Sequence, residues 1–436
     1  MAAKISRVPA KLLSDLLDGK RSEVTTKDFG VLLSTLNVSV NELCSEVERG
    51  HPSVLYMNRA EIHGSGRDVF RGGRHYYTYY SLPAPPNWVS PVLIDVLASP
   101  NEELIQNNGH LEPAITVNLG PGDIVGEWQR GTYTERRIIR ANRNAESDWV
   151  SGDSYFEPPY FPHTYGLISH LPAQILSCTI RSDLDAFVKE LNAWPFTSTE
   201  ALLSRMSGKV TGGTLLGWEL VRRGYSPSAI ECAFELPKGS VEDFINGSVE
   251  ALSFDNLQRI AVGIGVDYRI LLDPIIREDN LCQTWTTVEE TLKSVRSFRT
   301  YNVASVAASV RCSRACGFFM KVHNNDLSRE LDLAFPTACH YLVNSGTVRL
   351  RFFENSLLQE FDMQKGDAVW VGPFVQHAFI GSGNLLRMDT GDGLSSRDYL
   401  NMTNTADLAD TLVRAYQDLR SWNVTEMLSH NRQRTI

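Results

Sequence analysis

The sequence predicts an α+β protein in which a small helical domain followed by a β-barrel occurs twice. Three observations support this prediction. Apolar residues have helical spacing in 1–50 and 196–275, short β-favouring runs fill 51–195 and 276–436, and motifs of the first half recur in the second. We therefore expect four domains with these boundaries.

Both helical segments contain signals for short helices. In the first, leucines at helical spacing lie between Leu12 and Leu17, and Ser39 is a candidate N-cap. The second predicts helices over 215–223, 226–234, 241–245 and 254–262, the order of a helix-turn-helix domain. The third of these contains Glu242 and Asp243, whereas a helix that reads DNA bases needs Arg, Lys, Asn or Gln. We expect no nucleic-acid partner, and a ligand-sensing transcriptional regulator is a distant alternative.

The β segments consist of short runs between glycine and proline turns. In the first half the predicted strands are 76–80, 92–97, 115–119 and 175–180. In the second half they are 304–310, 318–322, 339–343, 348–353 and 368–371, and a final helix is expected over 406–422. Many short strands with such turns predict a closed barrel or a jelly roll.

Composition narrows the class of protein. The 436 residues carry a net charge of −9, which argues against a broad basic face for nucleic acid. We read neither an apolar signal segment at the start nor a run long enough to span a bilayer, so no membrane partner is expected. Seven scattered cysteines indicate free thiols in a reducing cytoplasm. The sequence leaves a homo-oligomer open.

A duplication becomes visible at one motif. Gly152-Asp153 with Pro159 and His163 aligns without a gap to Gly366-Asp367 with Pro373 and His377. His110 then falls opposite His340, and Glu157 falls opposite Val371. Two imidazoles without a carboxylate are a poor site for Fe(II). We expect the second half to have kept the scaffold and lost the metal, with His340 and His377 as ordinary buried histidines.

His110, Glu157 and His163 are the candidate metal ligands. Two histidines and one carboxylate on strands and tight turns are the donor set of a mononuclear Fe(II) oxygenase. Prolines at 158, 159 and 162 prevent a helix between Glu157 and His163 and make that turn rigid. On spacing alone, three unrelated polar residues are an equal alternative.

Four further residues suit an anionic substrate. Arg71 offers paired donors to a phosphate or phosphonate, and Tyr79 adds a hydroxyl. Asn107 precedes the first histidine and has an amide to donate, and Lys20 supplies a point charge from the first helical segment. Each of these residue types alone is more often solvated or structural.

Long stretches resemble the 2-hydroxyethylphosphonate dioxygenase family, which is shared with methylphosphonate synthase. The resemblance is carried by the residues from Asn107 to Ile124, by Gly152 to His163, and by shorter matches. These matches are Ser207 to Val210, Thr284 to Thr287, Gly372 to Val375 and Leu400 to Thr405, so the similarity spans nearly the whole chain.

The resemblance implies two cupin barrels, each preceded by a helical domain. It implies Fe(II) bound by His110, Glu157 and His163. By motif position, Arg71, Tyr79, Asn107 and Lys20 would bind the phosphonate. The implied reaction is O₂-dependent cleavage of the carbon–carbon bond of 2-hydroxyethylphosphonate to hydroxymethylphosphonate and formate. Neither 2-oxoglutarate nor an external reductant would be consumed.

Methylphosphonate synthase, which acts on the same substrate, is the closest alternative. That branch carries a glutamine ligand four residues after the first histidine. Here the position is Ala114, and Glu157 remains as the third ligand, which favours the dioxygenase.

Overall fold

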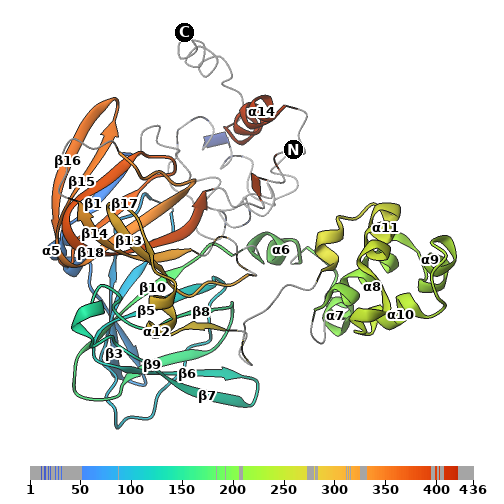
Figure 1. The fold of residues 1–436 in the computed structure, drawn as a ribbon, viewed down its shortest axis with the longest axis horizontal. Helices are drawn as coiled ribbons and strands as arrows, with labels where there is room; N and C mark the ends of the chain where they lie inside the picture. The colour runs from blue at the N-terminus through green and yellow to red at the C-terminus, as the bar shows by residue number, and fades with distance from the viewer. Residues whose placement is uncertain are drawn as a thin grey trace. The chain divides into compact units, whose positions relative to one another are not determined.

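The structure is a computed structural model, and Figure 1 shows its fold. It describes residues 52–86, 88–182, 184–191, 193–205, 210–272, 279, 283–310, 312, 314, 316–324, 331–393, 398–399, 402 and 407–420. In the N-terminal region it describes only residues 11, 14, 15, 18, 20, 25, 28 and 31. The helices predicted around Leu12 and Ser39 therefore lie largely outside the described residues. The mixture of helices and sheets confirms the α+β class.

The first β region contains ten strands, a short helix and a 3-10 turn. The elements are β1 (Val54–Met57), α5 (Arg59–Gly64), β2 (Arg67–Arg71), β3 (Arg74–Ser81), β4 (Val92–Val96), β5 (Ala114–Pro121), β6 (Ile124–Arg130), β7 (Tyr133–Ile139), η1 (Ala145–Ser147), β8 (Ser154–Glu157), β9 (His163–Leu167) and β10 (Ala173–Thr179). The four strands predicted in this half are β3, β4, β5 and β10.

Two sheets face each other in this region. One has the order β11-β8-β5-β10-β4-β3-β2, in which β11 is Thr284–Thr286, and the other has the order β7-β6-β9. The Tyr77 hydroxyl, from the first sheet, lies 3.0 Å from the Thr164 hydroxyl of the second. Tyr77 and Thr164 are both buried, so the space between the sheets is the interior of a barrel.

The second β region is built mainly from long bent strands. Its elements are β11 (Thr284–Thr286), α12 (Val288–Lys293), β12 (Arg296–Ser297), β13 (Tyr301–Ser305), β14 (Gly317–Asn324), β15 (Thr337–Glu354), β16 (Leu357–Gln364), β17 (Ala368–Val371) and β18 (His377–Gly393). One sheet has the order β1-β17-β15-β18-β14-β13-β12, and β16 pairs with β15. The cores of β14 and β17 match their predicted ranges.

Two strand predictions in this half are corrected. The runs 339–343 and 348–353 form the single strand β15, which continues through an irregularity between Val343 and Ser345. The predicted strand over 304–310 ends at Ser305. Its continuation leaves the sheet because the amide of Ala307 donates to the Ser154 hydroxyl of the first barrel at 2.8 Å.

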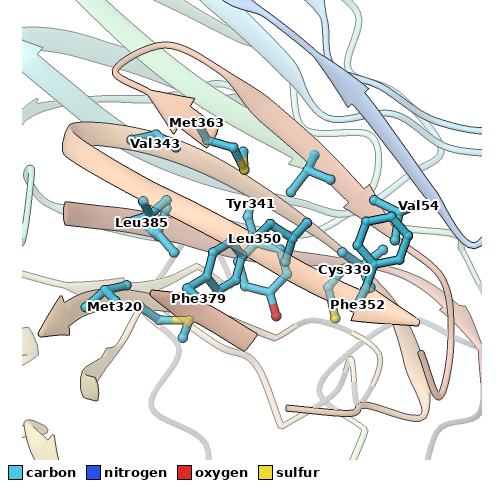
Figure 2. Close-up of a cluster of buried hydrophobic side chains, with 14 of the residues drawn as sticks. Val54, Met320, Cys339, Tyr341, Val343, Leu350, Phe352, Met363, Phe379 and Leu385 are labelled. Atoms are coloured by element: carbon cyan, nitrogen blue, oxygen red, sulfur yellow. The ribbon is translucent and has the colours of Figure 1, made fainter. Parts of the chain in front are cut away.

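Each β region receives a strand from the other half of the chain. β1 pairs with β17 in the second sheet, where Figure 1 shows it among the strands of the second half. Its Val54 joins the buried cluster drawn in Figure 2. In return, β11 pairs with β8 in the first barrel. Domains predicted as consecutive stretches of sequence do not include this exchange of strands.

The repeated Gly-Asp motif fixes both exchanged segments. Asp367 Oδ1 accepts from the amide of Arg59 at 2.8 Å, at the start of α5. Asp153 Oδ1 accepts from the amide of Val288 at 2.9 Å, at the start of α12. In each case a carboxylate satisfies an otherwise unpaired donor of a helix's first turn. The duplication of this motif, predicted from sequence, is therefore confirmed.

The intervening segment forms a separate compact unit, residues 182–284 with 309–312. Its elements are α6 (Leu184–Leu191), α7 (Phe196–Arg205), α8 (Gly212–Arg223), α9 (Pro227–Ala233), α10 (Ser240–Ile245), η2 (Val249–Ala251), α11 (Phe254–Ile264) and η3 (Tyr268–Leu271). Leu216, Leu220 and Ile260 belong to its core. The four helices predicted here are α8, α9, α10 and α11, and the predicted final helix is α14 (Leu408–Arg420). Among the described helices, none has the length and apolarity needed to cross a membrane.

Candidate metal centre

His110, Glu157 and His163 converge in the first barrel. His110 lies in the loop before β5, Glu157 ends β8, and His163 begins β9. One donor atom from each side chain lies within 4.8 Å of the others. Within the described part of the chain, no other three His, Cys, Asp or Glu side chains come together in this way.

Backbone contacts bring the three ligands to one place. Ala114 on β5 pairs directly with Glu157 on β8. Four residues earlier, the carbonyl of His110 accepts from the amide of Tyr160 at 2.7 Å. Gly109 allows this approach, because its φ is +72° and an added Cβ would lie 2.6 Å from the carbonyl carbon of Tyr160. The loop before β5 is thus fixed to the turn between Glu157 and His163.

Backbone carbonyls fix the tautomer of both histidines. His110 Nδ1 is hydrogen-bonded to the Glu112 carbonyl, and His163 Nδ1 lies 2.8 Å from the Phe161 carbonyl. Because a carbonyl oxygen only accepts, each Nδ1 carries the proton and each Nε2 keeps a lone pair. The lone pair of His163 Nε2 faces the side-chain amide of Asn107 at 3.1 Å.

The carboxylate of Glu157 is almost completely buried, with 2% of the residue exposed. Its Oε1 lies 2.8 Å from His163 Nδ1, and its Oε2 accepts from the indole N–H of Trp128 at 2.7 Å. Burial lowers the pKa of His163, but the charge of Glu157 and the hydrogen bonds with Glu157 and the Phe161 carbonyl together outweigh burial, so this pKa lies above its usual value. Two imidazoles and one carboxylate, oriented by fixed partners, fit an Fe(II) ion.

Arg71 and Tyr79 lie beside the same site. Arg71 Nη1 donates to the Ile105 carbonyl at 2.7 Å and lies 3.4 Å from the His163 carbonyl. Its guanidinium carbon lies 5.1 Å from the centroid of the Tyr77 ring. Burial raises the pKa of Tyr79, and the charge of Arg71 partly opposes this rise. Tyr79 therefore remains a neutral hydroxyl next to a cation, an arrangement that suits an anionic ligand.

Asn107 stabilises the loop that carries His110. Its side-chain oxygen accepts from the amides of Gly109 and His163, both at 2.9 Å. These bonds close the loop around the first histidine. Its amide nitrogen, near His163 Nε2, is the group left for a ligand.

Lys20 has no described contact with these residues. Its ammonium lies 2.8 Å from the Asp18 carboxylate, and 68% of its side chain is exposed. Its role in substrate binding stays a prediction.

Sequence reasoning missed the aromatic residues packed behind Glu157. Trp128 is fully buried, and the centroid of its ring lies 5.2 Å from that of Tyr155 and 5.5 Å from that of Trp285. The hydroxyls of Tyr155 and Tyr165 are hydrogen-bonded to each other. The only sequence signal was the match around Trp285, which carried no residue role.

The second barrel retains one of the three ligand positions. Cys339 pairs with Val371 as Ala114 pairs with Glu157, and four residues before Cys339 lies Phe335. The Phe335 carbonyl accepts from the Phe374 amide at 2.6 Å, which repeats the contact between His110 and Tyr160. His377 repeats His163, with its Nδ1 2.8 Å from the Val375 carbonyl.

The predicted equivalence of His110 and His340 is therefore wrong. His340 lies inside β15 between Cys339 and Tyr341, which both join the barrel core. Since side chains alternate along a strand, His340 points to the opposite face. The alignment matched histidine with histidine, whereas the ligand position lies four residues before the residue that pairs with Glu157 or Val371.

Arg387 supplies a fixed cation in the second barrel. Its guanidinium carbon lies 3.9 Å from the centroid of the Phe335 ring, and Nη2 lies 2.7 Å from the Asp389 carboxylate. Arg387 is 2% exposed. This barrel thus contains a buried ion pair among aromatic residues, with Phe335 and Val371 at the places of two metal ligands.

Known proteins resemble this chain over nearly its whole length. A family model described as the 2-hydroxyethylphosphonate dioxygenase cupin-like domain matches residues 63–180. A 2-hydroxyethylphosphonate dioxygenase of Streptomyces viridochromogenes is 34% identical over 421 residues, which cover 96% of this chain and 94% of the relative. A methylphosphonate synthase of Nitrosopumilus maritimus is 24% identical over 376 residues, covering 78% and 74%.

Two solved structures superpose on this chain over nearly its whole length. The cadmium-containing protein PhpD, complexed with hydroethylphosphonate, superposes with a TM-score of 0.74 at 33% identity, covering 95% of this chain and 94% of that one. A Streptomyces albus protein, solved with 2-hydroxyethylphosphonate and Fe(II) bound, gives a TM-score of 0.72 at 18% identity, with coverages of 94% and 92%. At that identity the likeness establishes the fold alone.

Proposed function

Because the chain belongs to the 2-hydroxyethylphosphonate dioxygenase family, we propose that it cleaves the carbon–carbon bond of 2-hydroxyethylphosphonate with O₂. The products are hydroxymethylphosphonate and formate, and the context is phosphonate biosynthesis. One observation carries the proposal: the two-histidine, one-carboxylate group His110, Glu157 and His163 inside the cupin-like domain.

His110, Glu157 and His163 would hold Fe(II), which would supply a site for electron exchange between the substrate and O₂. The overall reaction needs only 2-hydroxyethylphosphonate and O₂ as reactants. Both oxygen atoms of O₂ appear in the summed products, and the substrate provides all four electrons. Neither 2-oxoglutarate nor an external reductant is consumed.

The other residues bind and orient the phosphonate. Arg71 supplies the cation, Tyr79 a neutral hydroxyl donor, and Asn107 a side-chain amide next to His163. We include Lys20 as a further cation, on the strength of the family resemblance alone. Paired donors fix both the position and the rotation of a phosphonate group, so the reacting carbon is presented in one geometry.

The surroundings of Glu157 suit chemistry that must exclude water. Glu157, Trp128 and Tyr155 are buried, and apolar rings cover the carboxylate from behind. A site closed in this way keeps reactive oxygen species from solvent and strengthens the electrostatic contacts with the substrate.

The position of Ala114 favours the dioxygenase over methylphosphonate synthase. Ala114 pairs directly with Glu157, so its methyl group lies beside the proposed carboxylate ligand. A methyl group provides no donor atom, whereas the amide oxygen of a glutamine at this place would.

We also propose the organisation and setting predicted from sequence. The four regions 1–50, 51–195, 196–275 and 276–436 would form two helical domains, each followed by a cupin barrel. The described cysteines are free thiols, which suits a cytoplasmic enzyme. The proposal leaves open whether chains associate into a homo-oligomer.

Phosphorus NMR of a reaction mixture tests the function. Protein loaded with Fe(II) is mixed with 2-hydroxyethylphosphonate and O₂, and an identical sample is kept anaerobic. We expect hydroxymethylphosphonate and an equal amount of formate only with O₂. Methylphosphonate as the main product would assign the chain to the alternative activity, and unchanged substrate would reject both.

A further inference from the structure

The Glu157 carboxylate has two partners of different kinds. Oε1 lies 2.8 Å from His163 Nδ1, while Oε2 accepts from the Trp128 N–H at 2.7 Å. An indole N–H can only donate, so it occupies a lone pair of Oε2 and fixes the rotation of the carboxylate. Trp128 is fully buried, and no water competes for this bond.

We propose that Trp128 is a positioning residue that occupies Oε2 of Glu157 and leaves Oε1 as the oxygen that would bind the metal. The proposal rests on the proposed iron site. Binding through one oxygen of Glu157 would leave more room at the ion for substrate and O₂ than binding through both. Partners that orient a ligand in this way also strengthen metal binding.

The second barrel supports the pairing of Trp128 with Glu157. Trp128 lies opposite His163 between β6 and β9, and Phe352 lies opposite His377 between β15 and β18. Where the first barrel has Trp128 and Glu157, the second therefore has Phe352 and Val371. Both belong to the apolar core shown in Figure 2, in which Phe352 is labelled. The indole donor is present in the half that has the carboxylate and is replaced by a phenyl ring in the half that lacks it.

Gly126 makes room for the indole. It precedes Trp128 by two residues on β6, so the two positions share one face of the strand. A Cβ at Gly126 would lie 2.1 Å from the Trp128 ring. The fully buried ring has little space to retreat, and this glycine therefore sets where the indole lies.

Trp285 also packs against the indole of Trp128 and comes from the second half of the chain. It lies on β11, the strand exchanged into the first barrel. Its ring is stacked on Tyr155 at a centroid distance of 4.9 Å and meets Trp128 edge-on at 5.5 Å. The guanidinium carbon of Arg137 lies 5.1 Å from the centroid of the Trp285 ring. The second half thus contributes to the metal centre of the first through Trp285.

Anaerobic titration of the metal-free protein with Co(II) tests the proposal without catalysis. Co(II) gives a visible absorption spectrum that reports the number and type of its ligands. For Trp128→Phe, which reproduces Phe352, we expect an altered spectrum and a Kd raised about tenfold or more. Trp370→Phe is the matched control. Trp370 is a buried indole of the second barrel whose N–H meets no acceptor among the described residues. We expect its Co(II) spectrum and Kd to equal those of the parent.

Trp285→Leu provides the second variant, because it leaves the N–H of Trp128 in place and removes only its support. We expect the same spectral change and a smaller rise in Kd, whether or not Trp128→Phe folds. An unchanged spectrum and Kd in Trp285→Leu and in a folded Trp128→Phe would overturn the positioning role and leave the proposed function intact. A parent protein that binds no Co(II) would overturn both.

Discussion

The carbonyl of His110 accepts a hydrogen bond from the amide of Tyr160 at 2.7 Å. This bond joins the loop that carries the first histidine to the turn between the other two proposed ligands. The spacing of the metal centre therefore depends on how closely two backbone segments approach.

Gly109→Ala should weaken metal binding at least tenfold. The added methyl would lie 2.6 Å from the Tyr160 carbonyl carbon and would force the two segments apart. Gly131→Ala is the control, since Gly131 also has a positive φ of +61° but has no atom within 4 Å of an added Cβ. Anaerobic Co(II) titration compares the two. Equal losses of affinity would mean that backbone strain, and not the contact with Tyr160, is responsible.

Arg71→Lys should raise KM for 2-hydroxyethylphosphonate about tenfold, because lysine keeps the charge but loses the paired donors. Metal affinity should not change, since Arg71 contacts the backbone carbonyls of Ile105 and His163 and no proposed ligand atom. Arg74→Lys is the matched control, because Arg74 lies 3.6 Å from the exposed Glu102. Steady-state kinetics of both variants measures the effect, and an unaltered KM in Arg71→Lys would remove Arg71 from the substrate site.

Asp367→Ala should lower the free energy of unfolding by about 2–3 kcal/mol. The change leaves the amide of Arg59 and the hydroxyl of Tyr56 without their acceptor, and both belong to the segment exchanged from the first half. Asp362→Ala, which removes only an exposed ion pair with Arg349, should cost less than about 1 kcal/mol. Calorimetry gives both values. A similar small loss in the two variants would show that the exchanged segment is held by other contacts.

Two buried histidines should make the protein less stable in mild acid. Burial lowers the pKa of His340 to about 3 and that of His377 to about 4. Both stay neutral in the folded protein, whereas the unfolded chain binds protons below its pKa of about 6.5. Their contribution is complete above that pH and is lost as pH falls toward the folded values, by about 1.4 kcal/mol per pH unit for each histidine.

The test of this pH dependence compares the parent with His377→Gln. The glutamine retains a polar partner for the Tyr341 hydroxyl, which lies 2.7 Å from His377 Nε2, but cannot titrate. We expect urea unfolding of the metal-free proteins at pH 7, 6 and 5 to show a shallower pH dependence in the variant. Parallel curves would contradict a neutral His377.

The sequence was sufficient for the features encoded by short, local patterns. The alternation of helical and strand segments, the strands around Tyr77 and Ile115, and the duplication around Gly152 and Gly366 all follow from periodicity and motif spacing. The three proposed ligands could be named because residue type and a proline-rich turn mark them.

The features that could not be predicted from the sequence depend on contacts between residues far apart in the chain. The exchange of β1 and β11 leaves no local signature, since these strands have ordinary composition. The bond from Trp128 to Glu157 joins residues 29 positions apart on different sheets. The equivalence of His110 with Phe335 appears only in the strand register, where matching histidine to histidine gave the wrong partner.

The number of iron ions bound per chain tests the central claim most directly. Metal-free protein is titrated anaerobically with Fe(II), together with Glu157→Ala from the first barrel and His377→Ala from the second. We predict one ion for the parent, one for His377→Ala, and at least 100-fold weaker binding for Glu157→Ala. Iron that stays bound after loss of Glu157, or leaves on loss of His377, would contradict an iron site built from His110, Glu157 and His163.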